Sequence, residues 1–101
     1  MVTRTPVSRE EVRVEVRGSL HGETASDFQA ELEKLLSSDY RTLTLDLSEV
    51  DSINSSSIGR ILLSRKKLAE QGRAIRIEGC SDPLFGTFQL IRFDKLVPIH
   101  R

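Results

Sequence analysis

Residues 45–59, with the sequence LDLSEVDSINSSSIG, combine the end of a strand, a polar loop and the beginning of a helix. Around the start of this stretch, leucines at positions 43, 45 and 47 alternate with polar residues, which is the pattern of a strand that buries one face. The polar run that follows predicts a loop over residues 48–54. Asn54 and the serines after it are good helix N-cap residues, so we expect a helix over about residues 56–70.

The same two patterns recur on both sides of this stretch. Valines at positions 12, 14 and 16 alternate with charged residues and predict a half-buried strand, and apolar residues at helical spacing predict a helix over roughly residues 25–37. Downstream we expect a strand over residues 74–77, a helix that starts at Ser81-Asp82-Pro83, and a last strand over residues 97–100. The first ten residues are polar and contain Pro6, so they are predicted to form a loose arm or an edge strand.

Strands that alternate with helices along a chain are typical of an α/β fold. Right-handed connections between successive strands then predict a mainly parallel sheet covered by helices. We expect this order over the whole chain, as a single domain of residues 1–101.

Size and composition limit the classes of protein that fit. The chain has 101 residues, enough for one hydrophobic core, and its 15 Lys and Arg residues balance its 15 Asp and Glu residues. The lack of a basic excess disfavours a nucleic-acid partner. The single cysteine, Cys80, cannot form an internal disulfide, and no apolar run is long enough for a membrane span or a signal peptide. We therefore expect a cytoplasmic protein without membrane insertion.

The serines at the start of the second helix allow two interpretations. Ser55 or one of its neighbours can simply cap the helix, which is the usual role of a serine in this position. Alternatively, one of them accepts a phosphate, because free backbone N–H groups and the positive end of the helix dipole favour a dianion there. A phosphate would leave the fold intact and change the surface by nearly two charges.

Few other residues suggest chemistry. Asp46, at the end of its strand, is predicted to accept hydrogen bonds from the nearby loop. His21 and His100 lie near no candidate nucleophile, and the sequence lacks both the Gly-x-Ser-x-Gly motif of hydrolases and a phosphate-binding glycine loop. A metal site on the acids near Asp46 would need paired acids after the first strand, where Ser19-Leu20-His21 stand instead. We therefore expect a protein that is not an enzyme and that holds no metal and no cofactor.

Four separated blocks resemble the STAS domain of anti-sigma-factor antagonists. That family has the pattern Leu-Asp-Leu-Ser-x-Val, a short gap, and then Ile-Asp-Ser-Ser-Gly-Leu-Gly at the start of a helix, which corresponds here to residues 45–50 and 53–59. Gly18-Ser19-Leu20 resembles the Gly-Glu-Leu of the family, and residues 93–99 resemble its apolar segment before the last strand. The resemblance covers roughly residues 12–99.

This resemblance implies a STAS-like fold, a small mainly parallel mixed sheet of about four to five strands with helices packed mostly on one face. It also implies a bacterial regulator of transcription that works by partner switching. In the family, the unphosphorylated antagonist binds an anti-sigma factor that is a serine kinase and so frees a sigma factor, and phosphorylation of a serine by that kinase releases the antagonist. A serine phosphatase is the other implied partner. ATP belongs to the kinase, and the chain itself is expected to be a monomer or a weak dimer.

Carried over to this chain, the family phosphoacceptor corresponds to Ser55, with its neighbour Ser56 as the second choice. The residues expected to contact a partner lie around it, at Asn54, Ser56, Ser57, Gly59 and Leu63. Gly59 lies one helical turn beyond Ser55 and would let a partner backbone approach. Leu63 lies on the predicted solvent side, where it is either a partner contact or an ordinary surface leucine.

Two residues depart from the family pattern. Asn54 stands where the family has Asp, which removes a negative charge beside the Ser55 hydroxyl, and Ser57 stands where the family has Gly. Both departures favour an alternative function, in which the chain is a STAS binding subunit of an ABC-transporter ATPase or of a larger signalling assembly and is never phosphorylated. The sequence leaves both functions open.

Overall fold

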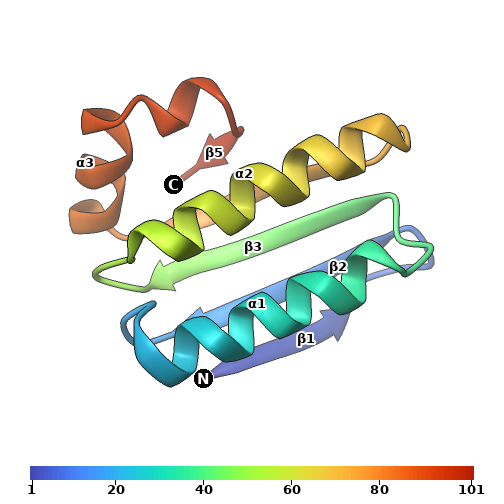
Figure 1. Cartoon of the computed structure of the whole chain (residues 1–101), viewed down its shortest axis with the longest axis horizontal. Coiled ribbons are helices and arrows are strands. Elements are labelled where there is room, and N and C mark those ends of the chain that lie inside the picture. The colour runs from blue at the N-terminus through green and yellow to red at the C-terminus, as the bar shows by residue number, and fades with distance from the viewer.

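The computed structural model covers residues 1–101 and contains one five-stranded sheet and three α-helices (Figure 1). The strands are β1 (Val2–Pro6), β2 (Glu11–Arg17), β3 (Thr42–Glu49), β4 (Ala74–Cys80) and β5 (Ile99–His100). The helices are α1 (Gly22–Leu36), α2 (Ser55–Glu70) and α3 (Asp82–Leu90), and a short 3-10 helix, η1 (Phe93–Lys95), precedes β5. The predicted order of strands and helices is therefore confirmed.

The strands follow one another across the sheet in the order β1-β2-β3-β4-β5, and only β1 runs antiparallel to its neighbour. Because each crossover from β2 onward moves in the same direction, right-handed connections place their helices on the same side. Figure 1 shows α1 and α2 side by side across one face of the sheet, with α3 near β5. The predicted mainly parallel mixed sheet with helices mostly on one face is confirmed.

The first residues form an edge strand and not a loose arm. β1 pairs with β2 from Val2 opposite Val16 to Pro6 opposite Val12. An edge position suits Pro6, because proline has no backbone N–H to donate to a further strand.

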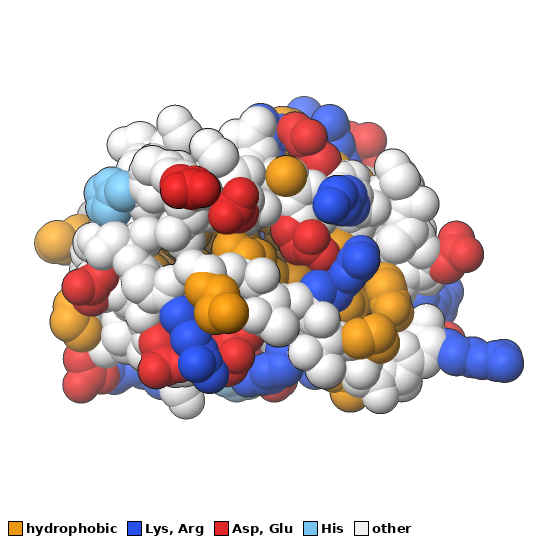
Figure 2. All heavy atoms as spheres, turned by 90° about the horizontal axis from the view of Figure 1, so that it is seen from below, with side chains coloured by type: hydrophobic (Ala, Val, Ile, Leu, Met, Phe, Trp, Pro, Cys, Tyr) orange, Lys and Arg blue, Asp and Glu red, His pale blue; other side chains and the backbone are white.

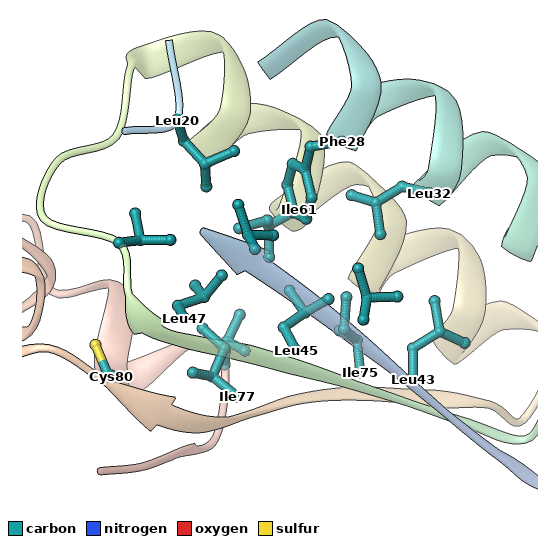
Figure 3. Packing of buried hydrophobic residues seen from close by; sticks show 14 of the residues in the cluster. Leu20, Phe28, Leu32, Leu43, Leu45, Leu47, Ile61, Ile75, Ile77 and Cys80 are labelled. Atoms are coloured by element: carbon teal, nitrogen blue, oxygen red, sulfur yellow. The ribbon is translucent and has the colours of Figure 1, made fainter. Parts of the chain in front are cut away.

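The hydrophobic core lies between the sheet and the helices α1 and α2 (Figure 3). The alternating valines of β2 and leucines of β3 are fully buried, as their period predicted. Phe28 and Leu32 from α1 and Ile61 and Leu68 from α2 are fully buried in the same cluster. Each such side chain contributes about 1.5–3 kcal/mol of burial free energy, so the core fixes how the two helices lie on the sheet.

Some predicted boundaries differ from the structure. α1 begins at Gly22, three residues before the predicted start, and its N-cap residue His21 makes no side-chain cap hydrogen bond. β3 continues to Glu49, because β-bulges in β3 and β4 shift the register and let the strand run on past Leu47. The last strand is only two residues long, because η1 and a turn occupy the residues before it. None of the helices has the length and apolar character needed to cross a membrane.

The face of the sheet away from the helices carries a network of ion pairs. Arg13 contacts Asp46 at 2.8 Å and Glu78 at 3.8 Å, and Arg76 contacts Glu11 at 3.4 Å and Glu78 at 3.3 Å. These long side chains cover the middle of β3, where Asp46 is only 9% exposed. This face therefore satisfies its charges internally.

Candidate functional site

The segments that precede α1 and α2 meet at the carboxyl ends of the parallel strands. Leu20 and Ile53 form an isolated parallel β-bridge beyond the ends of β2 and β3. The Leu20 amide donates to the Ser52 carbonyl at 2.9 Å, and the Asn54 amide donates to the Leu20 carbonyl at 3.0 Å. Because Leu20 is fully buried, this bridge anchors the start of α2 to the core.

Side chains reinforce the loop before α2. The Ser19 hydroxyl donates to the Asp51 carboxylate at 2.8 Å, and the His21 ring and the Ser52 hydroxyl lie 3.1 Å apart. The Ser81 hydroxyl donates to the Val50 carbonyl from the other side. The hydrogen bond from Ser19, together with backbone amides, lowers the pKa of Asp51 below its ordinary value. The segments that follow β2 and β4 therefore both hold this loop.

Asn54 is the N-cap of α2. Its side-chain oxygen accepts a hydrogen bond from the Ser57 amide at 2.8 Å. Among the N-cap candidates at residues 54–57, Asn54 therefore caps the helix and Ser55 does not, and the Asn54 side chain, predicted as a partner contact, is engaged in the cap. The amides of Ser55 and Ser56 have no hydrogen-bond partner within the chain, as is usual in a first helical turn.

The three serines that open α2 differ in exposure. Ser55 and Ser56 are exposed, whereas Ser57 is only 3% exposed. Ser57, predicted as a partner contact, is buried at the third position of the helix and lines a pocket beside α1. Ser55 and Ser56 are the accessible hydroxyls.

Ser55, Gly59 and Leu63 form a stripe along the exposed side of α2, which we call the outer ridge. All three are exposed, and their spacing of four residues places them on one face of the helix. Leu63 is 41% exposed, as predicted for the solvent side. A Cβ atom built on Gly59 would meet no atom within 4 Å, so the fold itself does not require a glycine there. The ridge thus presents, in a row, a hydroxyl, a position without a side chain and an apolar side chain.

A pocket of about 270 Å³ lies beside the ridge, between the first turns of α1 and α2. Among the residues that line it are Ser26 and Gln29 of α1 and Ser56, Ser57 and Arg60 of α2. Arg60 was not singled out from the sequence as a site residue, although its spacing of four residues from Ser56 was a signal that the two share a face. It also contacts Glu33 of α1 at 3.6 Å.

Asp46 lies inside β3, on the face away from the helices. Its carboxylate accepts hydrogen bonds from the Ser48 amide at 3.0 Å, from the Ser48 hydroxyl at 2.7 Å and from Arg13 at 2.8 Å. Burial raises the pKa of the Asp46 carboxyl, but these hydrogen bonds outweigh burial and hold the pKa below its ordinary value. Ser48 belongs to the predicted loop, but in the structure it is part of β3. Asp46 therefore stabilises the bulged end of the strand.

Cys80 and the acidic side chains offer no obvious reactive site. Cys80 is 7% exposed, and burial raises the pKa of its thiol to about 11, so the reactive thiolate form is scarce near neutral pH. No group of three or more His, Cys, Asp or Glu side chains is placed to hold a metal ion.

Comparison with known proteins gives one family and several similar structures. The family model described as "Mlab, STAS domain" matches residues 3–98, whereas no curated protein matches. The unphosphorylated form of the anti-sigma factor antagonist SpoIIAA has a TM-score of 0.84 at 16% identity, covering 100% of this chain and 89% of that chain. The phosphorylated form of Bacillus SpoIIAA has a TM-score of 0.77 at 16% identity, with coverages of 100% and 92%.

An anti-sigma factor antagonist from Mycobacterium paratuberculosis has a TM-score of 0.83 at 18% identity, covering 99% of this chain and 86% of that chain. At these identities the structural similarity shows a shared fold. The family model spans nearly all of the sequence, including the strand, loop and helix start on which the resemblance was based. The chain belongs to the STAS domain family.

Proposed function

We propose that this protein is a regulatory binding protein of the anti-sigma-factor-antagonist type, acting in the bacterial cytoplasm and switched by phosphorylation of Ser55. The observation that carries this proposal is the outer ridge of α2. An exposed serine hydroxyl lies there in line with Gly59 and the exposed Leu63, on a helix start that the core and the neighbouring loops hold in place. A kinase can reach this hydroxyl, and a docked partner would cover it.

The switch follows from the charge of the phosphate. An unphosphorylated ridge presents a neutral hydroxyl beside an apolar side chain, which an interface can bury at little cost. A phosphate on Ser55 adds nearly two negative charges that must be desolvated in the same interface. A penalty of about 3–4 kcal/mol is enough to weaken binding by a few hundredfold. The kinase supplies ATP, and this chain supplies only the accepting hydroxyl.

The proposed partners are an anti-sigma factor that is a serine kinase and a serine phosphatase that restores the hydroxyl. Their support is the fold shared with SpoIIAA, which is known in an unphosphorylated and a phosphorylated form, and the position of Ser55 in the family motif. No reaction is proposed for the chain itself.

The test is phosphorylation by a serine kinase encoded beside the gene. With that kinase and ATP, the wild-type protein should gain one phosphate on Ser55, detected by intact mass and located by peptide mapping. Ser55→Ala should remove the phosphate at position 55, and the matched control Ser56→Ala should retain it. Ser55→Asp should weaken kinase binding only partly, because a carboxylate has one charge and fewer acceptor oxygens than a phosphate. A protein that gains no phosphate from any co-encoded kinase would contradict the proposal.

The second candidate is a STAS binding subunit that is never phosphorylated, in an assembly with an ABC-transporter ATPase or a larger signalling complex. It is favoured by Asn54, which caps α2 with an uncharged amide where the antagonist motif has an acid beside the phosphoacceptor. Co-purification with a co-encoded transporter ATPase, unaffected by Ser55→Ala and disrupted by Leu63→Glu, would support this function.

A further inference from the structure

The pocket between α1 and α2 is lined without any acidic residue, although the chain contains 15 Asp and Glu residues. Arg60 is its only charged residue, and neutral hydrogen-bonding side chains from both helices surround it, with no carboxylate among the lining residues. The pocket has a volume of about 270 Å³ and is open to solvent on one side, so a small ion can enter it. The pocket is therefore suited to a small anion that accepts several hydrogen bonds.

Ser57 gives a second and independent indication of a ligand. It is 3% exposed and lines the same pocket, and its hydroxyl makes no hydrogen bond within the chain, because the bond to Asn54 uses the Ser57 amide. The buried side-chain atoms without a hydrogen-bond partner are Glu31 Oε1 and Ser64 Oγ, so the Ser57 hydroxyl is open to the pocket that it lines. An acceptor oxygen in the pocket can therefore take a hydrogen bond from it.

Ser56 lines this pocket too, and Arg60 follows it by one helical turn. Side chains four residues apart on a helix lie next to each other, so Arg60 is within reach of a group attached to the Ser56 hydroxyl. The present partner of Arg60 is Glu33, at 3.6 Å and with a half-exposed side chain. Such a surface pair is weak, so a doubly charged group can replace it.

We propose that Ser56 is a second phosphorylation position and that this pocket holds its phosphoryl group, with Arg60 as the counter-charge. The inference rests on the proposed function in taking the start of α2 as a kinase substrate. In the step, the Ser56 oxygen forms a bond to the γ-phosphorus of a nucleoside triphosphate on the kinase. The bond to the bridging oxygen breaks, the nucleoside diphosphate leaves, and the hydroxyl proton passes to a base of the kinase.

The two neighbouring serines then have different consequences. A phosphate on Ser55 stays on the outer ridge in solvent, where it opposes the partner. A phosphate on Ser56 lies in the pocket, pairs with Arg60, and releases Arg60 from Glu33. It leaves the ridge from Ser55 to Leu63 free of added charge.

The test needs neither the kinase nor the partner. Phosphoserine is incorporated during translation at position 56 or, as the matched control, at position 55 of the full chain. The second pKa of each phosphate is then measured by ³¹P NMR titration. We expect the pKa of the phosphate on Ser56 to be lower by about 0.5 unit or more, because an opposite charge stabilises the dianion. Arg60→Gln should abolish the difference, and Glu33→Gln, which removes the same ion pair but keeps Arg60, should preserve it.

Equal pKa values at the two positions, or a difference that survives Arg60→Gln, would overturn the proposal. Failure of the protein with phosphoserine at position 56 to fold would also overturn the proposal, because a phosphate that fits the pocket should not disrupt the fold. In a separate arm, inorganic phosphate is added to the unmodified protein. Shifts of the Ser57 and Arg60 NMR signals there, with equal pKa values in the two phosphoproteins, would assign the pocket to a free anion. The NMR test uses no kinase, so its result does not depend on whether a kinase phosphorylates Ser55. The kinase experiment described above tests the Ser55 switch by itself.

Discussion

Gly79 shows how one residue determines the shape of the sheet beside Asp46. It lies in the bulge of β4, where its φ of +94° is a conformation that residues with a side chain rarely adopt. A Cβ atom on Gly79 would lie 2.6 Å from the Asp46 carboxylate and 3.3 Å from Ser48. The glycine therefore makes room for the carboxylate that binds the end of β3.

Gly79→Ala should lower the free energy of unfolding by about 2 kcal/mol or more. The left-handed backbone costs an alanine about 1–2 kcal/mol, and displacing Asp46 weakens its hydrogen bonds to Ser48 as well. Gly59→Ala is the matched control, because it lies in a helix with open space around it and should stabilise the protein by about 0.5–1 kcal/mol. Urea unfolding curves measure both changes. Similar stabilities of the two variants would contradict this account of Gly79.

Single residues were predictable from the sequence where their role depends on near neighbours. Asn54 was among the N-cap candidates, and Asp46 was expected to accept hydrogen bonds, because both roles involve residues two or three positions away. Gly79 was missed, because its role depends on β4 packing beside β3, which no local pattern encodes. The spacing of Arg60 from Ser56 was visible in the sequence, but the position of Arg60 beside α1 was not.

Arg73, in the turn between α2 and β4, contacts the end of α1 and the loop that follows α1. Its guanidinium donates to the carbonyls of Leu35 at 2.9 Å and Leu36 at 3.0 Å, at the end of α1, and its Nε donates to the Tyr40 carbonyl. The last carbonyls of a helix have no partner within the helix, so this arginine satisfies groups that would otherwise need water. The end of α1 is thereby fixed to the turn that follows α2.

Arg73→Ala should lower the free energy of unfolding by about 2 kcal/mol, because several partly buried carbonyls lose a charged donor. Arg73→Lys should recover part of the loss, since an ammonium group keeps the charge but not the planar set of donors. Arg65→Ala, at an exposed position of α2, is the control and should change stability by less than about 0.5 kcal/mol. Guanidinium unfolding monitored by circular dichroism would compare the three variants. An Arg73→Ala variant as stable as Arg65→Ala would show that water replaces the arginine.

Leu63→Glu should leave the fold intact and weaken binding to the partner. Leu63 is 41% exposed on the outer ridge, so its replacement by an acid removes apolar contact area without opening the core. Leu62→Glu is the control for a misplaced core face, because Leu62 packs against the core cluster and its replacement should lower the melting temperature clearly. Thermal melts and calorimetric titration with the co-encoded kinase separate the two effects. Unchanged binding by Leu63→Glu would make Leu63 an ordinary surface leucine.

At the scale of the elements, sequence patterns predicted β2 to β5 and the three α-helices, but they left β1 open between a loose arm and an edge strand and misplaced several ends. The alternation in β3 was read as ending at Leu47, because a bulge breaks the period of two that defines the pattern. The last strand was predicted from residue 97, but Val97 is buried through the turn after η1 and not through a sheet. Burial was therefore predicted better than backbone conformation at the ends of elements.

Across the whole molecule, the two faces of the sheet have different chemistry. Figure 2 shows basic and acidic side chains interspersed on the side of α1 and β1, consistent with a net charge of 0. On the uncovered sheet face, Arg13 and Arg76 are each paired with two acids. The outer ridge on the helical face presents an exposed hydroxyl in line with an exposed apolar side chain, which is why we place the partner there. Balanced charge in the sequence could not reveal this division, because it depends on which residues the strands bring together.

The uncovered sheet face should also determine how the protein responds to acid. Arg13 holds Asp46 in its charged form, and the pKa of Asp46 is below the ordinary value. As the pH falls, this carboxyl is therefore protonated at a higher pH in the unfolded chain than in the folded protein. The stability that Asp46 contributes is therefore complete above the pKa of the unfolded chain, about 3.9, and is lost as the pH falls through the lower pKa of the folded state.

Asp46→Asn should be less stable at neutral pH, and its difference from the wild type should shrink below about pH 4. Asp51→Asn, which changes an exposed acid with a pKa lowered in the same direction, is the comparison that separates the contribution of Asp46 from that of the loop before α2. Urea unfolding at a series of pH values measures the three proteins, and a stability difference between wild type and Asp46→Asn that stays constant down to pH 2 would contradict a charged Asp46 in the folded state.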